Sequence, residues 1–194
     1  TKVIGEKEYA YTYDTSGKLA KLTQSRIETV VLGLTNLARG GTATHSTAFS
    51  GYEGSKAIDG VNGYQSTGWV ATNPNGINDW LQLDLGREVE VERLTYDTRY
   101  GPIYLSGSYK IYQQSFKISV SRDGVIWTEV VSRSAQTEPQ VYEFQITPIQ
   151  ARYVKVHSID SYYAQDPVNW NYAYVGEIEV YETRQTLTKV IGEK

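Results

Sequence analysis

The sequence predicts an all-β protein, an antiparallel jelly-roll β-sandwich with an N-terminal β-hairpin appendage. Two observations predict this fold class. From about residue 33 onward, short segments alternate apolar and polar residues with a period of two, as strands do when they bury one face. Clusters of Gly, Asn, Asp and Pro separate these segments, and no stretch after Gly40 keeps a helical period. The 194 residues suffice for one medium domain with a small appendage.

Residues 1–33 predict the hairpin. Tyr9, Tyr11 and Tyr13 alternate with other residues, an Asp-Thr-Ser-Gly turn signal follows, and alternation resumes at Lys18. The string from Tyr11 to Leu19 resembles the tyrosine-aspartate (YD) repeat of bacterial surface and toxin-shell proteins. A helix near residues 25–34 is the alternative for the end of this segment.

Both ends of the chain carry the same heptapeptide. Thr1–Lys7 reads Thr-Lys-Val-Ile-Gly-Glu-Lys and recurs as Thr188–Lys194, which is a repeat with a period of 187 residues. We interpret residues 183–194 as the start of the next unit of a tandem array, and a duplicated linker is the alternative. Because an unpaired strand edge seeks a partner, we expect the second copy to fray or to add to the hairpin of a neighbouring molecule.

Residues 34–182 predict the sandwich. Its clearest alternating segments are residues 81–85, 116–121, 142–146, 154–156 and 178–180. Trp80 and Trp127 adjoin two of these strands, and we expect them to fill the core because tryptophan in that position usually does.

Composition excludes several classes of function. The 19 basic and 22 acidic residues give a net charge of -3, which argues against nucleic acid as a partner, and no apolar run is long enough for membrane insertion. The chain has no cysteine, and two histidines cannot complete a zinc site. No nucleophile, phosphate-loop or zinc-protease motif is present. We therefore expect no enzyme activity, although a glycosidase with two carboxylates remains the enzymatic alternative.

An ordered set of motifs runs through residues 34–182. They are Asn36-Leu37-Ala38-Arg39-Gly40-Gly41, Ala57-Ile58-Asp59-Gly60, Trp80-Leu81-Gln82-Leu83-Asp84-Leu85-Gly86, Ser121-Arg122-Asp123-Gly124, Arg152-Tyr153-Val154 and Glu177-Ile178-Glu179-Val180-Tyr181. In this order and spacing they resemble a discoidin domain, the coagulation-factor C-type, galactose-binding-domain-like fold whose bacterial members are family 32 carbohydrate-binding modules. The resemblance implies a jelly roll of about eight strands with its ends close together. The lack of cysteine favours the sugar-binding branch over the disulfide-containing, phospholipid-binding one.

The resemblance also implies one structural calcium ion. Its ligands would be the side chains of Asp59, Thr67 and Glu177, with carbonyl groups of Lys56 and Gly176. The loop after Asp59 is rich in Gly and Asn, a composition that suits a cation with six to eight oxygen ligands. The alternative is that Asp59 caps a turn and Glu177 is a solvated strand residue.

Two aromatic-rich loops, residues 96–112 and 162–174, are the candidate ligand site. Sugars present apolar C–H faces and a ring of hydroxyl groups, so they suit an exposed aromatic plane beside polar side chains. Trp170 lies between two asparagines and is the stacking candidate, unless it packs across the end of the sandwich. The further candidates are Asn169, Arg99, Tyr100, Tyr52 and His45.

The function expected from these features is a non-catalytic carbohydrate-binding or adhesion module of a secreted or cell-surface bacterial protein. Its partners would be a glycan, either a polysaccharide or a surface glycoconjugate, and neighbouring domains of the same parent protein. The alternative is a structural spacer in a tandem surface array that binds no sugar. Membrane adhesion is disfavoured because the loops carry tyrosine and glycine rather than apolar tips.

Overall fold

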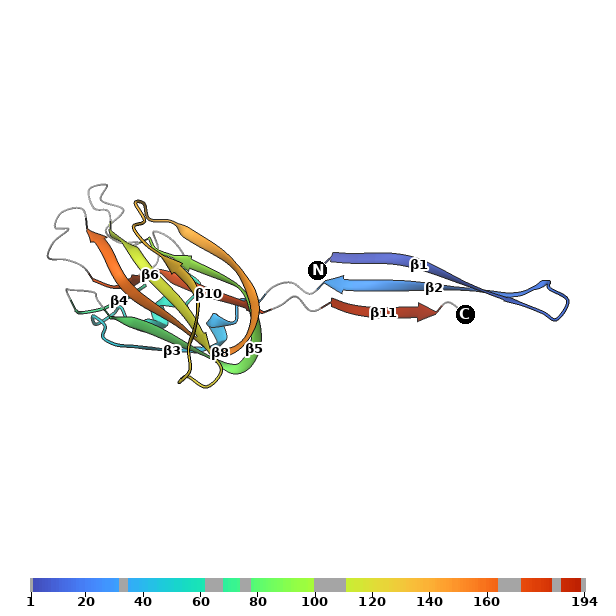
Figure 1. The fold of residues 1–194 in the computed structure, drawn as a ribbon, viewed down its shortest axis with the longest axis horizontal. Coiled ribbons are helices and arrows are strands. Elements are labelled where there is room, and N and C mark those ends of the chain that lie inside the picture. The colour runs from blue at the N-terminus through green and yellow to red at the C-terminus, as the bar shows by residue number, and fades with distance from the viewer. Residues whose placement is uncertain are drawn as a thin grey trace. The chain divides into compact units, whose positions relative to one another are not determined.

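The computed structural model describes residues 2–31, 35–61, 68–73, 78–99, 111–163, 172–182 and 186–192. The chain divides into two compact units, shown in Figure 1. Unit 1 comprises Thr1–Leu34 with Arg184–Lys194, and unit 2 comprises Thr35–Thr183. None of the helices in the described part of the chain is long and apolar enough to cross a membrane.

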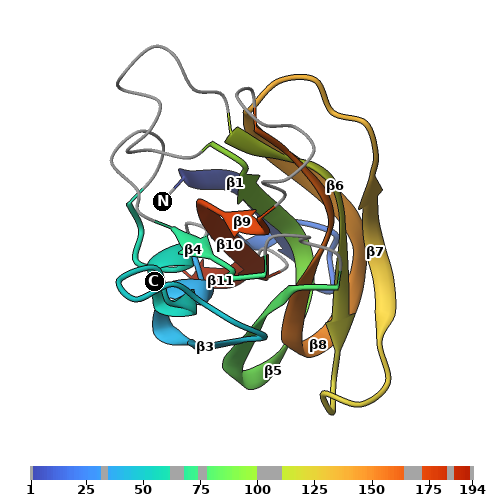
Figure 2. The ribbon, with the colours of Figure 1, turned by 90° about the vertical axis from the view of Figure 1, so that its left-hand side faces the viewer.

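Unit 2 is built from strands and two short 3-10 helices (Figure 2). Its elements are η1 (Ala38–Gly40), β3 (Thr42–His45), η2 (Gly54–Ala57), β4 (Trp69–Val70), β5 (Trp80–Asp97), β6 (Ile111–Ser121), β7 (Thr128–Arg133), β8 (Val141–Tyr163), β9 (Tyr174–Val175) and β10 (Glu177–Glu182). The main sheet has the order β10-β5-β8-β6-β7, with β3 also paired to β5. The strands β4 and β9 form a separate pair, and every pairing in unit 2 is antiparallel. The predicted all-β, antiparallel fold class is confirmed.

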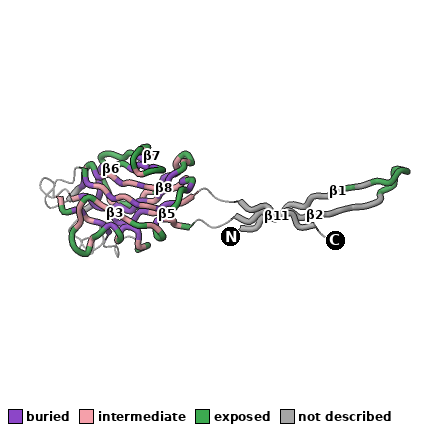
Figure 3. The backbone as a smooth tube through the Cα atoms, turned by 90° about the horizontal axis from the view of Figure 1, so that it is seen from below, coloured by how far each residue is buried: buried purple, intermediate pink, exposed green. Residues whose placement is uncertain are grey.

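The two longest strands of unit 2, β5 and β8, pair in two stretches with an interruption between them. The first part of β5, residues 80–84, pairs with residues 153–157 of β8, and the ladder resumes at Val89. The interruption contains Gly86, whose φ of +77° is a conformation that residues with a Cβ rarely adopt. One hydrophobic cluster includes buried residues from both parts of β5, and the buried positions follow the strands of unit 2 in Figure 3.

The alternation read from the sequence sets which residues enter this core. Leu81 and Leu83 are buried, and Gln82 between them is not. The expectation that Trp80 and Trp127 fill the core is wrong, because both are only half-buried. Since Leu81 takes the inner position, Trp80 belongs to the opposite face by the period of two. The ammonium of Lys155 lies 5.2 Å from the Trp80 ring and 4.0 Å from the Trp127 ring, a cation–π arrangement.

The two ends of unit 2 are held side by side, as the resemblance implied. The N–H of Leu37 donates to the carbonyl of Val180 at 2.8 Å. The side-chain carbonyl of Asn36 accepts the N–H groups of Ala38, at 3.0 Å, and of Val180, at 3.2 Å. The two bonds to Val180 hold the segment before η1 against β10, and the Asn36–Ala38 bond shapes the entry into η1.

Unit 1 is a three-stranded sheet with the order β1-β2-β11. Its strands are β1 (Lys2–Tyr13), β2 (Leu19–Val31) and β11 (Thr186–Gly192). At the turn between β1 and β2, a carboxylate oxygen of Asp14 accepts the N–H groups of Ser16 and Lys18, and Gly17 has a φ of +79°. Residues 25–31 lie in β2, so the helix alternative is wrong there.

The second heptapeptide copy pairs within its own chain. β11 is antiparallel to β2, on the edge of β2 that β1 does not occupy. We expected the second copy to fray or to join the hairpin of a neighbouring molecule. This prediction is wrong, because the copy pairs with β2 of its own chain. β2 has two edges, and β1 occupies only one of them. The other edge is available to a returning segment of the same chain, which here is β11.

Candidate functional site

Glu177, the first residue of β10, is a buried carboxylate with one unpartnered oxygen. Its residue surface is 1% exposed. One side-chain oxygen accepts the N–H of Gly60 at 3.0 Å, and the other has no hydrogen-bond partner in the part of the chain that the structure describes. Burial, helped by the nearby charges of Asp59 and Glu179, raises the pKa of Glu177 to about 8, against the Gly60 hydrogen bond and the charge of Arg39. Such a group favours a bound proton or a cation.

Asp59 supplies a second acidic group beside it. One carboxylate oxygen of Asp59 accepts the N–H of Val61 at 2.9 Å, and its carbonyl accepts a guanidinium N–H of Arg39 at 3.2 Å. Asp59 therefore does stabilise a turn, as its alternative reading had it. The alternative for Glu177, a solvated strand residue, is wrong because Glu177 is buried.

Gly60 brings this turn close to Glu177. Its φ is +80°, and a Cβ atom there would come within 2.6 Å of Cζ of Arg39. The Arg39 side chain could move aside, but the positive φ would still strain any residue with a Cβ, so the turn that presents the Gly60 N–H to Glu177 favours glycine.

The other predicted calcium ligands are only partly described. Gly176 is buried, and its N–H donates to the carbonyl of Asp97 at 2.9 Å. Lys56 is in η2, where its N–H donates to the carbonyl of Glu53 at 2.9 Å. Thr67 lies outside the described residues. Across the described ranges, no group of three or more His, Asp or Glu side chains could hold a metal, so an ion here would depend on carbonyl and hydroxyl oxygens as well.

Arg99 follows β5 and is fixed by a two-point ion pair. Its Nε lies 2.8 Å from one oxygen of Asp97 and its Nη2 lies 2.7 Å from the other. The Asp97 side chain is buried, whereas the Arg99 side chain is 26% exposed. The hydroxyl of Tyr174 donates to the Arg99 carbonyl at 2.6 Å. The guanidinium is thus held in one orientation at the surface.

A pair of aromatic rings lies on two segments of unit 2, one between β3 and η2 and the other just before β9. Phe49, which is 39% exposed, meets Tyr172 edge to face with ring centroids 5.3 Å apart. The N–H of Phe49 donates to the carbonyl of Val70 at 3.0 Å, and Val70 faces Tyr174 in the β4–β9 pair. Tyr172 belongs to the aromatic-rich loop singled out in the sequence, but Phe49 was missed, because nothing near it in the chain marks it.

The remaining predicted ligand residues divide into two groups. Tyr52 is half-buried and its carbonyl accepts the N–H of Val70 at 3.1 Å. The Nδ1 of His45 accepts the N–H of Gly54 at 3.2 Å, which gives His45 a structural role between β3 and η2. Their roles in binding stay predictions. Three other candidates lie outside the described residues: Trp170, Asn169 and Tyr100.

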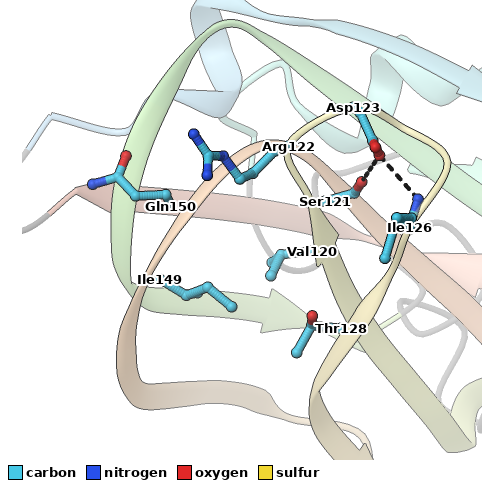
Figure 4. Close-up of a pocket in the computed structure, with 8 residues that line it drawn as sticks. All are labelled: Val120, Ser121, Arg122, Asp123, Ile126, Thr128, Ile149 and Gln150. Carbon is cyan, nitrogen blue, oxygen red and sulfur yellow. Dashed lines mark hydrogen bonds between the residues drawn. The ribbon is translucent and has the colours of Figure 1, made fainter.

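A shallow pocket of about 390 Å³ lies elsewhere on unit 2, between the β6–β7 turn and β8 (Figure 4). It contains none of the predicted site residues. The carboxylate of its Asp123 accepts the N–H groups of Val125 and Ile126 and the hydroxyl of Ser121. This carboxylate is therefore engaged in forming its own turn.

Comparison with known proteins gives the following results. The model of the F5/8 type C domain family matches residues 42–183. Chitosan-binding module 1 of a chitosanase/glucanase from Paenibacillus sp. IK-5 is 25% identical, with a TM-score of 0.56 over 76% of this chain and 98% of that one. The family 32 module of NanJ from Clostridium perfringens, solved with galactose, is 21% identical, with a TM-score of 0.60 over 77% of this chain and 100% of that one.

A third similar structure is CpGH89CBM32-5 from C. perfringens, solved with GalNAc-β-1,3-galactose. It is 19% identical, with a TM-score of 0.56 over 76% of this chain and 99% of that one. No curated protein matches the chain. The predicted resemblance to discoidin domains and family 32 modules is confirmed.

Proposed function

Because the chain belongs to the F5/8 type C domain family, we propose that it is a non-catalytic carbohydrate-binding or adhesion module with a structural calcium ion. The parent would be a bacterial protein that is secreted or displayed at the cell surface. The observation that carries the proposal is the Phe49–Tyr172 ring pair, in which Phe49 is exposed and Tyr172 is half-buried. The backbone of Phe49 is linked through Val70 of β4 and Tyr174 of β9 to Arg99, whose guanidinium Asp97 fixes.

This arrangement suits a sugar. The C–H face of a pyranose can pack on an aromatic ring, and its hydroxyl groups can accept hydrogen bonds from a guanidinium whose orientation is already fixed. The similar modules solved with galactose and with GalNAc-β-1,3-galactose support this class of ligand. Trp170, Asn169 and Tyr100, which lie outside the described residues, stay candidates for the same site.

The acidic pair supports the calcium ion. Glu177 brings a buried oxygen that lacks a partner, and Asp59 brings a second carboxylate on a separate loop. A divalent cation would neutralise both groups and connect the loop after η2 to β10. Hard oxygen ligands of this kind favour calcium over softer metals.

A glycan array followed by calorimetry with galactose and N-acetylgalactosamine tests the sugar proposal. We expect dissociation constants of roughly micromolar to millimolar, because a shallow surface offers one stacked ring and few hydrogen bonds. Trp170→Ala and Phe49→Ala should weaken binding at least tenfold. Trp127→Ala, which removes a half-buried tryptophan far from these loops in the sequence, is the matched control and should bind as the wild type does.

The spacer alternative is favoured by one observation, the pairing of both heptapeptide copies with β2 in unit 1. It predicts that a properly folded chain binds no glycan on the array, with calcium or without it. If the double variant Phe49→Ala, Trp170→Ala binds sugar as tightly as the wild type, the proposed site is wrong, although sugar binding itself is not.

A further inference from the structure

Unit 1 places two copies of one heptapeptide on opposite edges of the same strand. β1 and β11 are both antiparallel to β2, so they run in the same direction. Lys2 of the first copy faces Val31, whereas the equivalent Lys189 of the second copy faces Glu28. The second copy is therefore displaced by three residues along β2. In the described sheet, β1 and β11 are the edge strands.

Because the displacement is an odd number of residues, it exchanges the two faces of the second copy without changing its direction. Residues that face one another in a sheet share a face, and successive residues alternate between faces. Gly5 and Lys189 both face Glu28, so all three lie on one face. Lys2 is three residues from Gly5 and lies on the other face. Equivalent residues of the two copies thus occupy opposite faces, and both copies direct the same alternate backbone groups toward β2.

We propose that the hairpin sheet is a joint between copies of this chain. In this joint β11 is the first strand of a second hairpin, and the second strand of that hairpin pairs with the outer edge of β11. The reason is sequence identity: the heptapeptide that forms β11 from Thr188 onward also forms the start of β1, and all 12 residues of β1 pair with the second strand of its hairpin, β2. A second copy of residues 8–31 after the heptapeptide would supply the same turn and the same partner strand.

The β11–β2 register described here suits a single copy of the chain but cannot persist in the proposed joint. A strand between two partners must direct alternate backbone groups to each side. Here the heptapeptide directs toward β2 the same groups that β1 uses for its own hairpin, so it cannot hold both partners at once. Sliding β11 by one residue, so that Lys189 faces Ile27 or Thr29, resolves the conflict. It also returns equivalent residues to the same face in every copy, as a repeating sheet requires.

Engineered disulfides test the register, because the chain has no cysteine of its own. In the 194-residue chain, the pair E28C and K189C occupies facing positions and should close a disulfide. The pair T29C and K189C is the matched control, since those positions lie on opposite faces and should remain reduced. Melting temperatures of the reduced variants, compared with K189C alone, establish that each variant is folded.

The decisive experiment uses a protein in which residues 1–187 are followed by residues 1–194. We expect K189C to form a disulfide with I27C or T29C of the first copy, and no longer with E28C. In a separate variant, K189C should also close with V31C of the second copy, its partner within the new hairpin.

Two outcomes would overturn the joint. If K189C still closes with E28C in the two-copy protein, the heptapeptide belongs to the preceding unit alone. If K189C closes with V31C of the second copy but with no position of the first, the hairpins are independent. Neither outcome bears on sugar binding, because the candidate sugar site lies in unit 2.

Discussion

The sandwich of unit 2 and the hairpin turn of unit 1 show two different ways of fixing strand register. In the sandwich, Leu81, Ile118 and Ile178 are fully buried, so a slip of one residue would move apolar side chains to the surface. In unit 1, the described side chains of residues 11 and 13–19 are all exposed, and the turn at Asp14 sets the β1–β2 register. The comparison indicates that packing fixes the register of the sandwich, whereas at the described turn of unit 1 the hydrogen bonds of Asp14 do so.

The largest expected effect comes from Phe116→Ala, which breaks the packed region. The Phe116 ring is fully buried and meets Tyr96 edge to face with centroids 4.7 Å apart. Losing it should cost about 3–5 kcal/mol of the free energy of unfolding of unit 2. The matched variant in unit 1 is Tyr13→Ala, at a residue that is 63% exposed, which should change stability by less than about 0.5 kcal/mol. Urea unfolding curves compare the two, and equal losses would contradict the distinction.

Calcium should produce the next largest effect, and only in unit 2. If the ion binds the folded state alone, the melting temperature should rise with the logarithm of calcium concentration. EDTA should remove this rise, and Asp59→Ala or Glu177→Gln should abolish it. Asp14→Ala, which removes a carboxylate from unit 1, is the control and should keep the full response. A wild-type melting temperature that is unchanged by both calcium and EDTA would show that no such site exists.

Without calcium, the stability of unit 2 should depend on pH through Glu177. The pKa of this group is about 8 in the folded protein, against an ordinary value of 4.5. The folded state therefore holds a proton that the unfolded state releases, so stability is full below pH 4.5 and is lost as the pH rises through 8. Urea unfolding in EDTA between pH 5 and pH 9 measures this slope. Glu177→Gln should flatten it, and a slope that survives this substitution must come from another group.

Calcium should reverse the sign of this dependence. The ion requires the ionised form of Glu177, so it competes with the proton. Its stabilising effect should therefore be larger at pH 9 than at pH 6. The comparison of Tm with and without calcium at those two values checks this expectation.

The smallest expected effect concerns the turn of unit 1. Asp14→Ala removes the acceptor for the N–H groups of Ser16 and Lys18. Hydrogen exchange should accelerate at the amides of β1 and β2, while the melting of unit 2 stays unchanged. Exchange that accelerates equally in β5 would mean that the two units unfold together.

Most strands could be predicted from the sequence, because alternation is a local property. The same alternation places Trp80 outside the core once Leu81 is inside. The wrong prediction for Trp80 arose because the residue type was given more weight than its position in the alternation. The Phe49–Tyr172 contact could not be predicted, because it joins segments that only the folded backbone brings together. The proposed calcium ligands could be named only through family resemblance, because the burial of Glu177 follows from the packing of β10 and has no local signal in the sequence.

The clasp between Leu37 and Val180 has a mechanical consequence. Because the chain enters and leaves unit 2 at neighbouring points, tension applied through its two ends acts first on that hydrogen bond and on the one between the Val180 N–H and Asn36. The central strands β5, β8 and β6 lie outside the direct path of this load. A pull along the polypeptide would therefore be resisted first by these bonds between the two ends, before the ladders of the central strands carry the load.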